Sequence, residues 1–214
     1  ESSYYNFSPD ITFLVIDIRS LLGDNFYLPY EISDNERKSL VKEKINELEN
    51  LIQKFNDNSN SKLVLTNFNI PSYSPNGIIE TKTKFGFHEM IEEINSSLRN
   101  LVKNYNSVYV FDFNQFVSKY GEKNIFDYRQ FFLGDIQITF NYIPSFANEL
   151  LSYIKPISGI NRKCIVLDLD NTLWGGIIGE DGINEIELGH TSNGKAYVEF
   201  QKQLLSLWKQ GIIL

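Results

Sequence analysis

The sequence contains a single cysteine, Cys164, among its 214 residues. One thiol cannot form an internal disulfide, so the chain is not a small disulfide-stapled domain, and it suits a reducing compartment such as the cytoplasm. No apolar run approaches the roughly 18 residues of a membrane-spanning helix, and no signal peptide opens the chain. We therefore expect a cytoplasmic protein that makes no membrane contact.

Basic residues are scarce relative to acidic ones. The chain has 20 Lys and Arg against 27 Asp and Glu, a formal net charge of −7, and its basic residues form no dense run. Because nucleic-acid phosphates are bound by a surplus of Lys and Arg, this balance argues against a nucleic-acid partner. Hydrophobic residues make up 42% of the chain, with 16 Phe and 12 Tyr, which is enough to fill a globular core. The first residue is Glu1 rather than Met, and we expect a piece of a longer polypeptide.

Residues 1–157 show an alternation of strand and helix patterns. Near-continuous apolar runs predict three strands, at 11–18, 62–68 and 107–113, the first of them buried on both faces. Apolar stripes at helical spacing predict helices over 34–55, 86–105, 114–120 and 142–154, followed by a linker at Pro156–Gly159. This alternation predicts an α/β domain in which helices cover both faces of a parallel sheet.

Polar side chains stand near the carboxyl ends of these predicted strands. They are Asp17, Asn67 and Asp112. Parallel sheets place their ligands at this edge, so the three residues are candidates for a binding site. The interpretation that we favour is plainer, because Asp and Asn at such positions usually serve as turn residues and helix caps.

A second unit is predicted over residues 158–214. Its expected elements are a buried strand at Lys163–Leu169, a hairpin over 176–188 with its tip at Gly179–Gly182, a helix from Ser192 or Asn193 to Gln210, and the start of a strand at Ile212–Leu214. The domain boundary is therefore placed between residues 157 and 158. Because the last predicted strand has only begun, we expect the fold to continue beyond Leu214.

The segment DLDNT, Asp168–Thr172, follows the predicted strand of the second unit. Two carboxylates two residues apart, Asp168 and Asp170, suit phosphoryl transfer, since one attacks phosphorus while the other handles the proton of the leaving group. Mg²⁺ would offset their charge beside a phosphate, and backbone N–H groups of the following turn would hold phosphoryl oxygens. The alternative is a helix start at which Asp and Asn act only as caps.

The run KCIVLDLDNTLWGGIIGEDG, Lys163–Gly182, resembles the FkbH-like branch of the haloacid dehalogenase superfamily. The resemblance implies a Rossmann-like α/β domain with Asp168 as nucleophile and Asp170 as general acid/base. It implies Mg²⁺ bound by Asp168 and Asp170, in the second case through the backbone carbonyl. Thr172, Gly175 and Gly176 would support the loop and the substrate, and the hairpin would form a flap over the site. The first 157 residues are similar in layout to the SGNH-hydrolase-like domain, a three-layer flavodoxin-like arrangement, that precedes this domain in the family.

FkbH-like proteins form glyceryl-acyl carrier protein from 1,3-bisphosphoglycerate for polyketide biosynthesis. The resemblance therefore implies acyl carrier protein and a phosphorylated three-carbon substrate as partners. A thioester intermediate on the enzyme would need a cysteine, and Cys164 is the one available. The competing interpretation of Cys164, which we favour, is a small buried strand residue.

The chain departs from both family patterns. An SGNH hydrolase needs a GDS serine and a DxxH histidine, but no GDS occurs and the segment Asp127–Gln130 has the aspartate without the histidine. The first domain is therefore expected to be non-catalytic. The Ser or Thr, the Lys and the later acidic pair that complete the phosphatase site would lie beyond Leu214, so we expect this piece alone to be inactive.

Three functions remain open at this stage. They are a glyceryl transferase and phosphatase, a general small-molecule phosphatase, and a carrier-protein docking module formed by the first domain. The remaining candidate side chains have plain interpretations: a partly exposed helix residue for His88, a loop residue for His190, solvated turn residues for Glu180 and Asp181, and core packing for Trp174.

Overall fold

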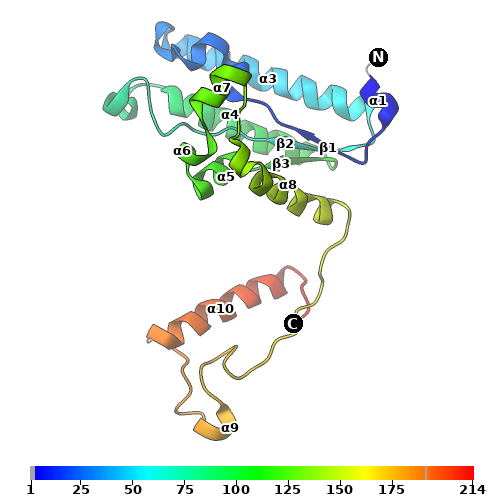
Figure 1. Ribbon diagram of the computed structural model, residues 1–214, viewed down its shortest axis with the longest axis vertical. Helices are drawn as coiled ribbons and strands as arrows, with labels where there is room; N and C mark the ends of the chain where they lie inside the picture. The colour runs from blue at the N-terminus through cyan, green and yellow to red at the C-terminus, as the bar shows by residue number, and fades with distance from the viewer. Residues whose placement is uncertain (1–2, 191) are drawn as a thin grey trace. The chain divides into compact units, whose positions relative to one another are not determined.

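The structure is a computed structural model and describes residues 3–190 and 192–214 (Figure 1). The chain divides into two compact units, one ending at Ile157 and the other running from Ser158 to Leu214. Each is described by itself.

The first unit is built on a parallel sheet of three strands in the order β1-β2-β3. The strands are β1 (Ile11–Leu14), β2 (Lys62–Thr66) and β3 (Val108–Phe111). The expected α/β class and parallel pairing are confirmed, with Ile11 opposite Lys62 and Leu63 opposite Val108. β1 is half-buried, which corrects the expectation of a strand buried on both faces, because it lies at an edge of the sheet while β2 lies at the centre.

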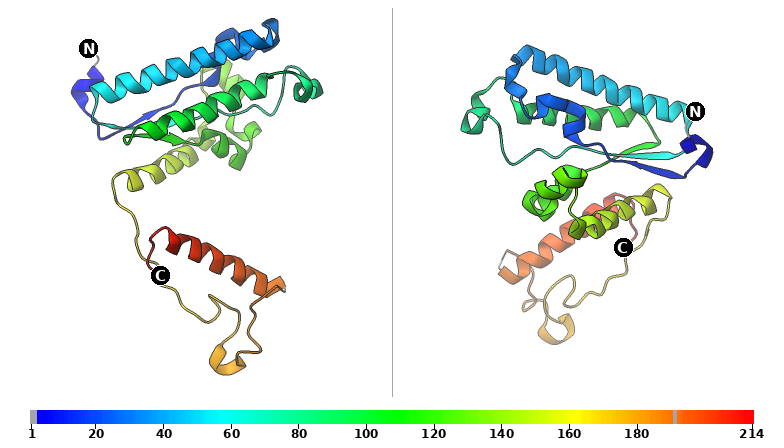
Figure 2. Two further views of the ribbon diagram at one scale, coloured as in Figure 1. Left: turned by 180° about the vertical axis from the view of Figure 1, so that it is seen from behind. Right: turned by 45° about the horizontal axis from the view of Figure 1, so that its top comes forward.

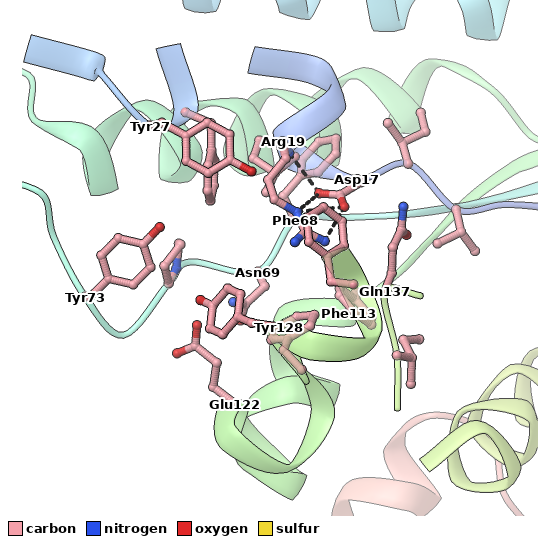
Figure 3. Close-up of a pocket in the computed structure, with 18 of the residues that line it drawn as sticks. Asp17, Arg19, Tyr27, Phe68, Asn69, Tyr73, Phe113, Glu122, Tyr128 and Gln137 are labelled. Atoms are coloured by element: carbon pink, nitrogen blue, oxygen red, sulfur yellow. Dashed lines mark hydrogen bonds and ion pairs between the residues drawn. The ribbon is translucent and has the colours of Figure 1, made fainter. Parts of the chain in front are cut away.

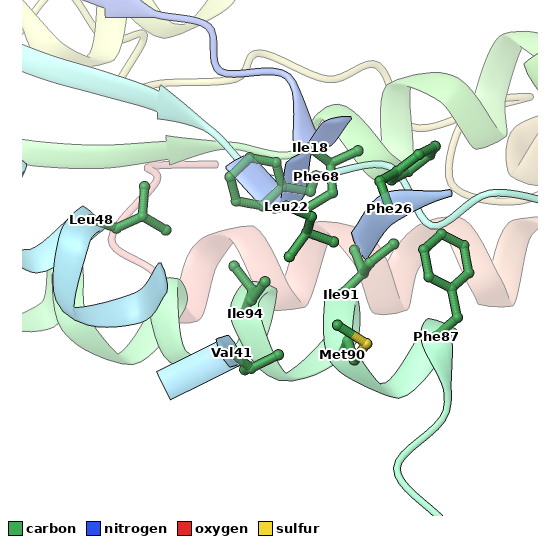
Figure 4. Packing of buried hydrophobic residues seen from close by; sticks show 10 residues of the cluster. All are labelled: Ile18, Leu22, Phe26, Val41, Leu48, Phe68, Phe87, Met90, Ile91 and Ile94. Carbon is green, nitrogen blue, oxygen red and sulfur yellow. The ribbon is translucent and has the colours of Figure 1, made fainter. Parts of the chain in front are cut away.

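Helices α2 (Ile18–Leu22), α3 (Asp34–Asn58) and α4 (Phe87–Leu101) cover one face of this sheet (Figure 2). Their apolar stripes meet in a cluster that includes Leu22, Val41, Met90 and Ile91 (Figure 4). α3 begins at a capping box, in which the N–H of Ser33 donates to Oε2 of Glu36 at 2.7 Å and the Glu36 N–H donates to the Ser33 hydroxyl at 3.4 Å. The cap explains why the helix starts where its apolar periodicity starts.

Helices α5 (Phe113–Tyr120) and α8 (Ile143–Ile157) cover the opposite face. The side chains of β2 alternate between the layers, so Leu63 and Leu65 pack toward α3 and α4 while Val64 packs toward α5 and α8. α8 runs through Pro156, so the linker expected at Pro156–Gly159 begins only after Ile157. Pro156 lies in the last turn of the helix. Because proline has no backbone N–H, one carbonyl of the preceding turn has no helical partner, but this carbonyl is close to the helix end and to solvent.

Short elements fill the connections of the first unit. They are α1 (Ser3–Phe7), α6 (Glu122–Ile125), α7 (Tyr128–Gly134) and the 3₁₀ turns η1 (Gly23–Phe26), η2 (Pro29–Glu31), η3 (Gly77–Lys82), η4 (Val102–Asn104) and η5 (Phe140–Tyr142). Helices of four to seven residues carry too little periodicity to be recognised in a sequence.

The second unit contains α9 (Ile178–Asp181) and α10 (Ser192–Lys209). The helix expected from Ser192 or Asn193 is confirmed, but the strand expected at Lys163–Leu169 is reduced to a single parallel bridge between Cys164 and Ile213. Val166 is 93% exposed, so this segment is not buried on both faces. The reason is that, among the residues described, only the segment around Ile213 pairs with it, and a strand becomes buried through neighbours on both sides.

No helix within the described ranges is long and apolar enough to cross a membrane.

Candidate functional site

The acidic loop of the second unit is closed by a pair of hydrogen bonds between Asn171 and Gly176. The Gly176 N–H donates to Oδ1 of Asn171 at 2.9 Å, and the Asn171 N–H donates to the Gly176 carbonyl at 3.3 Å. Asn171 adopts φ of 54°, a left-handed conformation that Asn tolerates better than most residues. Asn171 therefore sets the turn that carries the chain from Asp170 toward the flap.

The two predicted catalytic carboxylates differ in their surroundings. Asp168 is exposed, and its Oδ1 accepts the N–H of Leu169 at 2.8 Å. Asp170 is half-buried, and its Oδ1 accepts both the indole N–H of Trp174 at 2.9 Å and the N–H of Ile178 at 3.2 Å. Asp168 is thus open to an approaching group, while one oxygen of Asp170 is fixed by the loop and the base of the flap.

Trp174 has a role that sequence reasoning missed. It was expected to be core, but it is half-buried and its polar edge orients Asp170. A buried or half-buried indole N–H needs an acceptor, and the carboxylate four residues earlier was the nearby one in the sequence. The spacing of Asp170 and Trp174 was therefore the sequence signal from which this hydrogen bond could have been predicted.

Gly175 and Gly176, predicted to support the loop, lie where side chains would collide. A Cβ at Gly175 would come within 2.9 Å of Cβ and Oε2 of Glu187 and 3.0 Å of Cε2 of Tyr197. Gly176 has φ of 94°, and a Cβ there would lie 2.9 Å from Oδ2 of Asp181. These glycines allow the loop, the far leg of the flap and α10 to approach one another.

The flap differs in its tip from the expected hairpin. Its legs pair where expected, since Gly175 and Glu187 exchange two backbone hydrogen bonds at 3.1 and 2.8 Å. The tip at Gly179–Gly182 is mostly one turn of helix, α9, rather than a β-turn. The Asp181 carboxylate closes this turn by accepting the Ile177 N–H at 2.8 Å, so Asp181 is a structural residue of the flap and not merely a solvated one.

Among the described residues, no hydrogen bond joins the side chain of Cys164, Thr172 or either histidine to the carboxylates of Asp168 and Asp170. Cys164 is exposed, which corrects the expectation of a buried strand residue, because the segment around it has few neighbours. Thr172 is half-buried and its N–H donates to the Leu169 carbonyl at 3.2 Å. His190 is exposed, and His88 is half-buried in the first turn of α4 with Nε2 3.0 Å from the Tyr73 carbonyl oxygen.

At the carboxyl edge of the first unit's sheet, the capping interpretation is confirmed. Asp17 caps α2 by accepting the Arg19 N–H at 2.8 Å, and Asp112 caps α5 by accepting the Gln115 N–H at 2.9 Å. Asn67 joins this network by donating to Asp112 Oδ1 at 2.8 Å. None of the three is left as a free catalytic group.

A cavity of about 90 Å³ lies at the same edge, beyond the carboxyl ends of the strands (Figure 3). Its walls are largely apolar and aromatic, and its polar lining includes Arg19, Asn69, Glu122 and Gln137. Sequence reasoning found Asp17 but missed these four residues. They lie in loops or at the starts of helices, where no periodic pattern marks the side chains that face inward.

Two charged groups of this cavity, Asp17 and Arg19, form an ion pair. The Arg19 guanidinium binds Asp17 through Nε, 2.9 and 3.1 Å from its two carboxylate oxygens, and through Nη2, 2.5 Å from Oδ2. The same guanidinium stacks 3.6 Å above the Phe131 ring. Burial raises the pKa of the Tyr73 phenol at the cavity wall, so this phenol stays neutral at physiological pH.

Metal ligands are few. Within residues 3–190 and 192–214, no group of three or more His, Cys, Asp or Glu side chains is placed to hold a metal ion. The oxygen donors of the acidic loop are of the kind that Mg²⁺ prefers, and Mg²⁺ often uses one or two carboxylates and completes its shell with waters and substrate phosphate. The donor chemistry fits Mg²⁺, while the number of side chains makes only part of a site.

Comparisons with known proteins bear on both units. A family model described as FkbH, N-terminal domain, matches residues 1–155. The chain is also similar to the solved N-terminal part of the protein BF1531 from Bacteroides fragilis, described as containing a phosphatase domain and complexed with Mg, with 27% identity and a TM-score of 0.82. The match covers 99% of this chain and 55% of that one, so the chain spans about half the length of this relative. No curated protein matches.

Proposed function

Because the chain belongs to the FkbH family, we propose that it forms part of an enzyme that makes glyceryl-acyl carrier protein from 1,3-bisphosphoglycerate, with phosphoryl chemistry at the acidic loop. The observation that carries the phosphoryl part is the similarity of 99% of the chain, acidic loop included, to a protein described as containing a phosphatase domain. The glyceryl substrate and the carrier protein rest on the family resemblance of the Lys163–Gly182 run.

In this proposal Asp168 is the nucleophile and Asp170 the general acid/base. An Asp168 carboxylate oxygen bonds to phosphorus as the bond from phosphorus to the substrate oxygen breaks, and protonated Asp170 gives its proton to that oxygen. Water then attacks phosphorus, Asp170 takes the proton of the water, and phosphate leaves Asp168. The exposure of Asp168 and the fixed orientation of Asp170 support this division of roles.

Magnesium is the proposed cofactor. When bound, Mg²⁺ would offset the negative charge that builds up between carboxylates and phosphate, with the Asp168 carboxylate and the Asp170 backbone carbonyl as its ligands from this chain. The relative described as complexed with Mg supports this choice.

Transfer of the glyceryl group is the second part of the proposal. A thiolate would bond to the acyl carbon of 1,3-bisphosphoglycerate, and the phosphate on that carbon would leave. The exposed Cys164 is accessible for this role. However, the four residue steps from Cys164 to Asp168 span roughly 13 Å when extended, so the two side chains would not act on the same atom. Glyceryl loading that is unchanged in a Cys164→Ser variant would eliminate the covalent role.

The experiment uses the full-length protein with labelled 1,3-bisphosphoglycerate, Mg²⁺ and holo-acyl carrier protein. We expect a gain in the mass of the carrier together with release of phosphate. Asp168→Asn should abolish removal of the phosphate ester, and Glu180→Gln, which changes an exposed carboxylate on α9, should leave it intact. Phosphate release without a mass gain on the carrier would support the second candidate, a general small-molecule phosphatase, which the description of the relative favours.

A further inference from the structure

The two carboxylate oxygens of Asp170 have different surroundings. Oδ1 accepts two hydrogen bonds, from the indole Nε1–H of Trp174 at 2.9 Å and from the Ile178 N–H at 3.2 Å. Among the described residues, no hydrogen bond occupies Oδ2. Because an oxygen that already accepts from two donors has little room for a further proton, the oxygen of Asp170 that is left to carry one is Oδ2.

The indole of Trp174 is held in place by contacts on both sides of it in the chain. On one side, Nε2 of Gln201 on α10 donates to the Leu173 carbonyl at 2.7 Å. On the other side, Gly175 and Glu187 exchange two backbone hydrogen bonds, at 3.1 and 2.8 Å. The backbone that carries the indole is therefore fixed by α10 and the far leg of the flap, and not by the carboxylate that the indole contacts.

Packing alone would account for an aromatic ring at position 174. The ring borders an apolar groove of the second unit, together with side chains that include Leu169 and Val198. Packing does not require an N–H, however, and a half-buried indole could donate to water instead. The N–H of Trp174 donates to Asp170, so the polar part of this side chain has a use that packing does not explain.

We propose that Trp174 is a positioning residue for proton transfer: its N–H, together with the Ile178 N–H of the flap, holds Oδ1 of Asp170 and leaves Oδ2 to carry the proton. This inference rests on the phosphoryl chemistry proposed above. In the first step, the proton on Oδ2 passes to the leaving oxygen, which keeps the electron pair of its bond to phosphorus. In the second step, Oδ2 takes a proton from the attacking water.

A positioning role and a packing role differ in how they depend on the leaving group. An alkoxide is a strong base and leaves phosphorus readily only when it receives a proton, whereas p-nitrophenolate is a weak base and leaves without one. Loss of the indole N–H should therefore slow the reaction of an alkyl phosphate much more than that of an aryl phosphate. Loss of packing should slow both reactions alike.

The test measures kcat/KM, which covers the steps up to departure of the leaving group, for the full-length protein with Mg²⁺. In Trp174→Phe, which keeps an aromatic ring and removes the N–H, we expect kcat/KM for 3-phosphoglycerate to fall about tenfold or more. The value for p-nitrophenyl phosphate should change by less than about twofold. Trp174→His should recover part of the loss, because its Nε2–H can take the place of the indole N–H.

The matched control is Trp208→Phe, which changes an exposed tryptophan of α10 and should leave both values of kcat/KM unchanged. A second measurement follows the hydrogen bond itself and needs no turnover. In a nitrogen–proton correlation spectrum of the full-length protein, the indole resonance that is missing from the Trp174 variants belongs to Trp174. Asp170→Ala, which removes the acceptor, should move this resonance, whereas Glu180→Gln, at an exposed position of α9, should leave it in place.

The outcomes separate this inference from the function on which it rests. If the parent hydrolyses 3-phosphoglycerate and Asp168→Asn does not, the proposed function stands. Equal slowing of both esters in Trp174→Phe, an unchanged kcat/KM for 3-phosphoglycerate, or an indole resonance that does not respond to Asp170→Ala would then overturn the positioning role alone. A parent that hydrolyses neither ester would overturn the positioning role and the proposed function together.

Discussion

Individual side chains in this protein act mainly by holding loops at the ends of the regular elements. Asp17, Asp112 and Ser33 cap helices, while Asp170 and Asn171 close the acidic loop. Each of these interactions is made over a few residues of sequence. Glu80 and Gly175 are different, because the groups that surround them lie far away in the sequence or in neighbouring elements. Substitutions at both positions therefore test tertiary contacts.

Gly175→Ala should destabilise the second unit by about 1–3 kcal/mol, because its Cβ would press on Glu187 and on the ring of Tyr197. Both tryptophans of the chain, Trp174 and Trp208, belong to the second unit, so urea unfolding followed by Trp fluorescence reports on it. Gly179→Ala is the control, since nothing lies within 4 Å of a Cβ at this position of α9. Equal unfolding midpoints for the two variants would contradict the proposed crowding.

Glu80 makes stability depend on pH. Burial acts to raise its pKa, but hydrogen bonds from the Ser74 hydroxyl at 2.5 Å, the Tyr30 hydroxyl and the His88 N–H at 2.9 Å outweigh it and lower the pKa. A carboxyl whose pKa is lower in the folded state stabilises the protein above its unfolded pKa, and this stabilisation is lost as the pH falls through the folded pKa.

We therefore expect Glu80→Gln to reduce the loss of stability on acidification. The measurement is the free energy of unfolding between about pH 6 and pH 3, a range that spans the ordinary pKa of Glu. Glu92→Gln, at an exposed position of α4, serves as the control. The interpretation fails if parent and Glu80→Gln lose stability in parallel over this range.

At the scale of elements, α4 and the loop after β2 are joined by one side chain. Asn95 is 3% exposed and pairs with both backbone groups of Phe68. These two hydrogen bonds fix the start of the loop after β2 against α4. The apolar stripe of α4 predicted the helix, but a polar residue within that stripe gave no sign of its partner.

Asn95→Leu should cost about 2–4 kcal/mol of unfolding free energy, because it leaves a buried N–H and a buried carbonyl without partners. Asn100→Leu, an exposed change on the same helix, is the matched control. Far-UV circular dichroism during urea unfolding gives the stability, and a cost no larger than that of the control would show that Asn95 does not fix the loop.

At the scale of the whole molecule, the two units differ in how much apolar surface they bury. Among the described residues, Leu204 is the one hydrophobic side chain of the second unit that is buried, whereas the first unit has core clusters on both faces of its sheet. Val166 and Ile183 of the second unit are 93% and 76% exposed. Because buried apolar surface supplies most of the stability of a fold, the units should not be equally stable.

The 214-residue chain should therefore unfold in two steps. Trp fluorescence, which follows the second unit, should change at a lower urea concentration than far-UV circular dichroism, which is dominated by the helices of the first. In hydrogen exchange, backbone amides of α10 should exchange faster than those of α4. Coincident transitions by both probes would mean that the chain unfolds as a single cooperative unit.

The sequence by itself determined the class of the fold, the order of its main elements and the family. Apolar runs and stripes are local, so they predicted three parallel strands and the helices α3, α4, α5, α8 and α10. The polar residues at the strand ends predicted the caps at Asp17 and Asp112. The phosphoryl chemistry proposed for DLDNT was likewise inferred from contiguous residues. The exposure of Cys164, the helical tip of the flap and the link from Trp174 to Asp170 were decided by tertiary structure, because each depends on which segments become neighbours. Asn95 is the clearest case, since only the folded chain brings its amide against the backbone of Phe68, 27 residues earlier in the sequence.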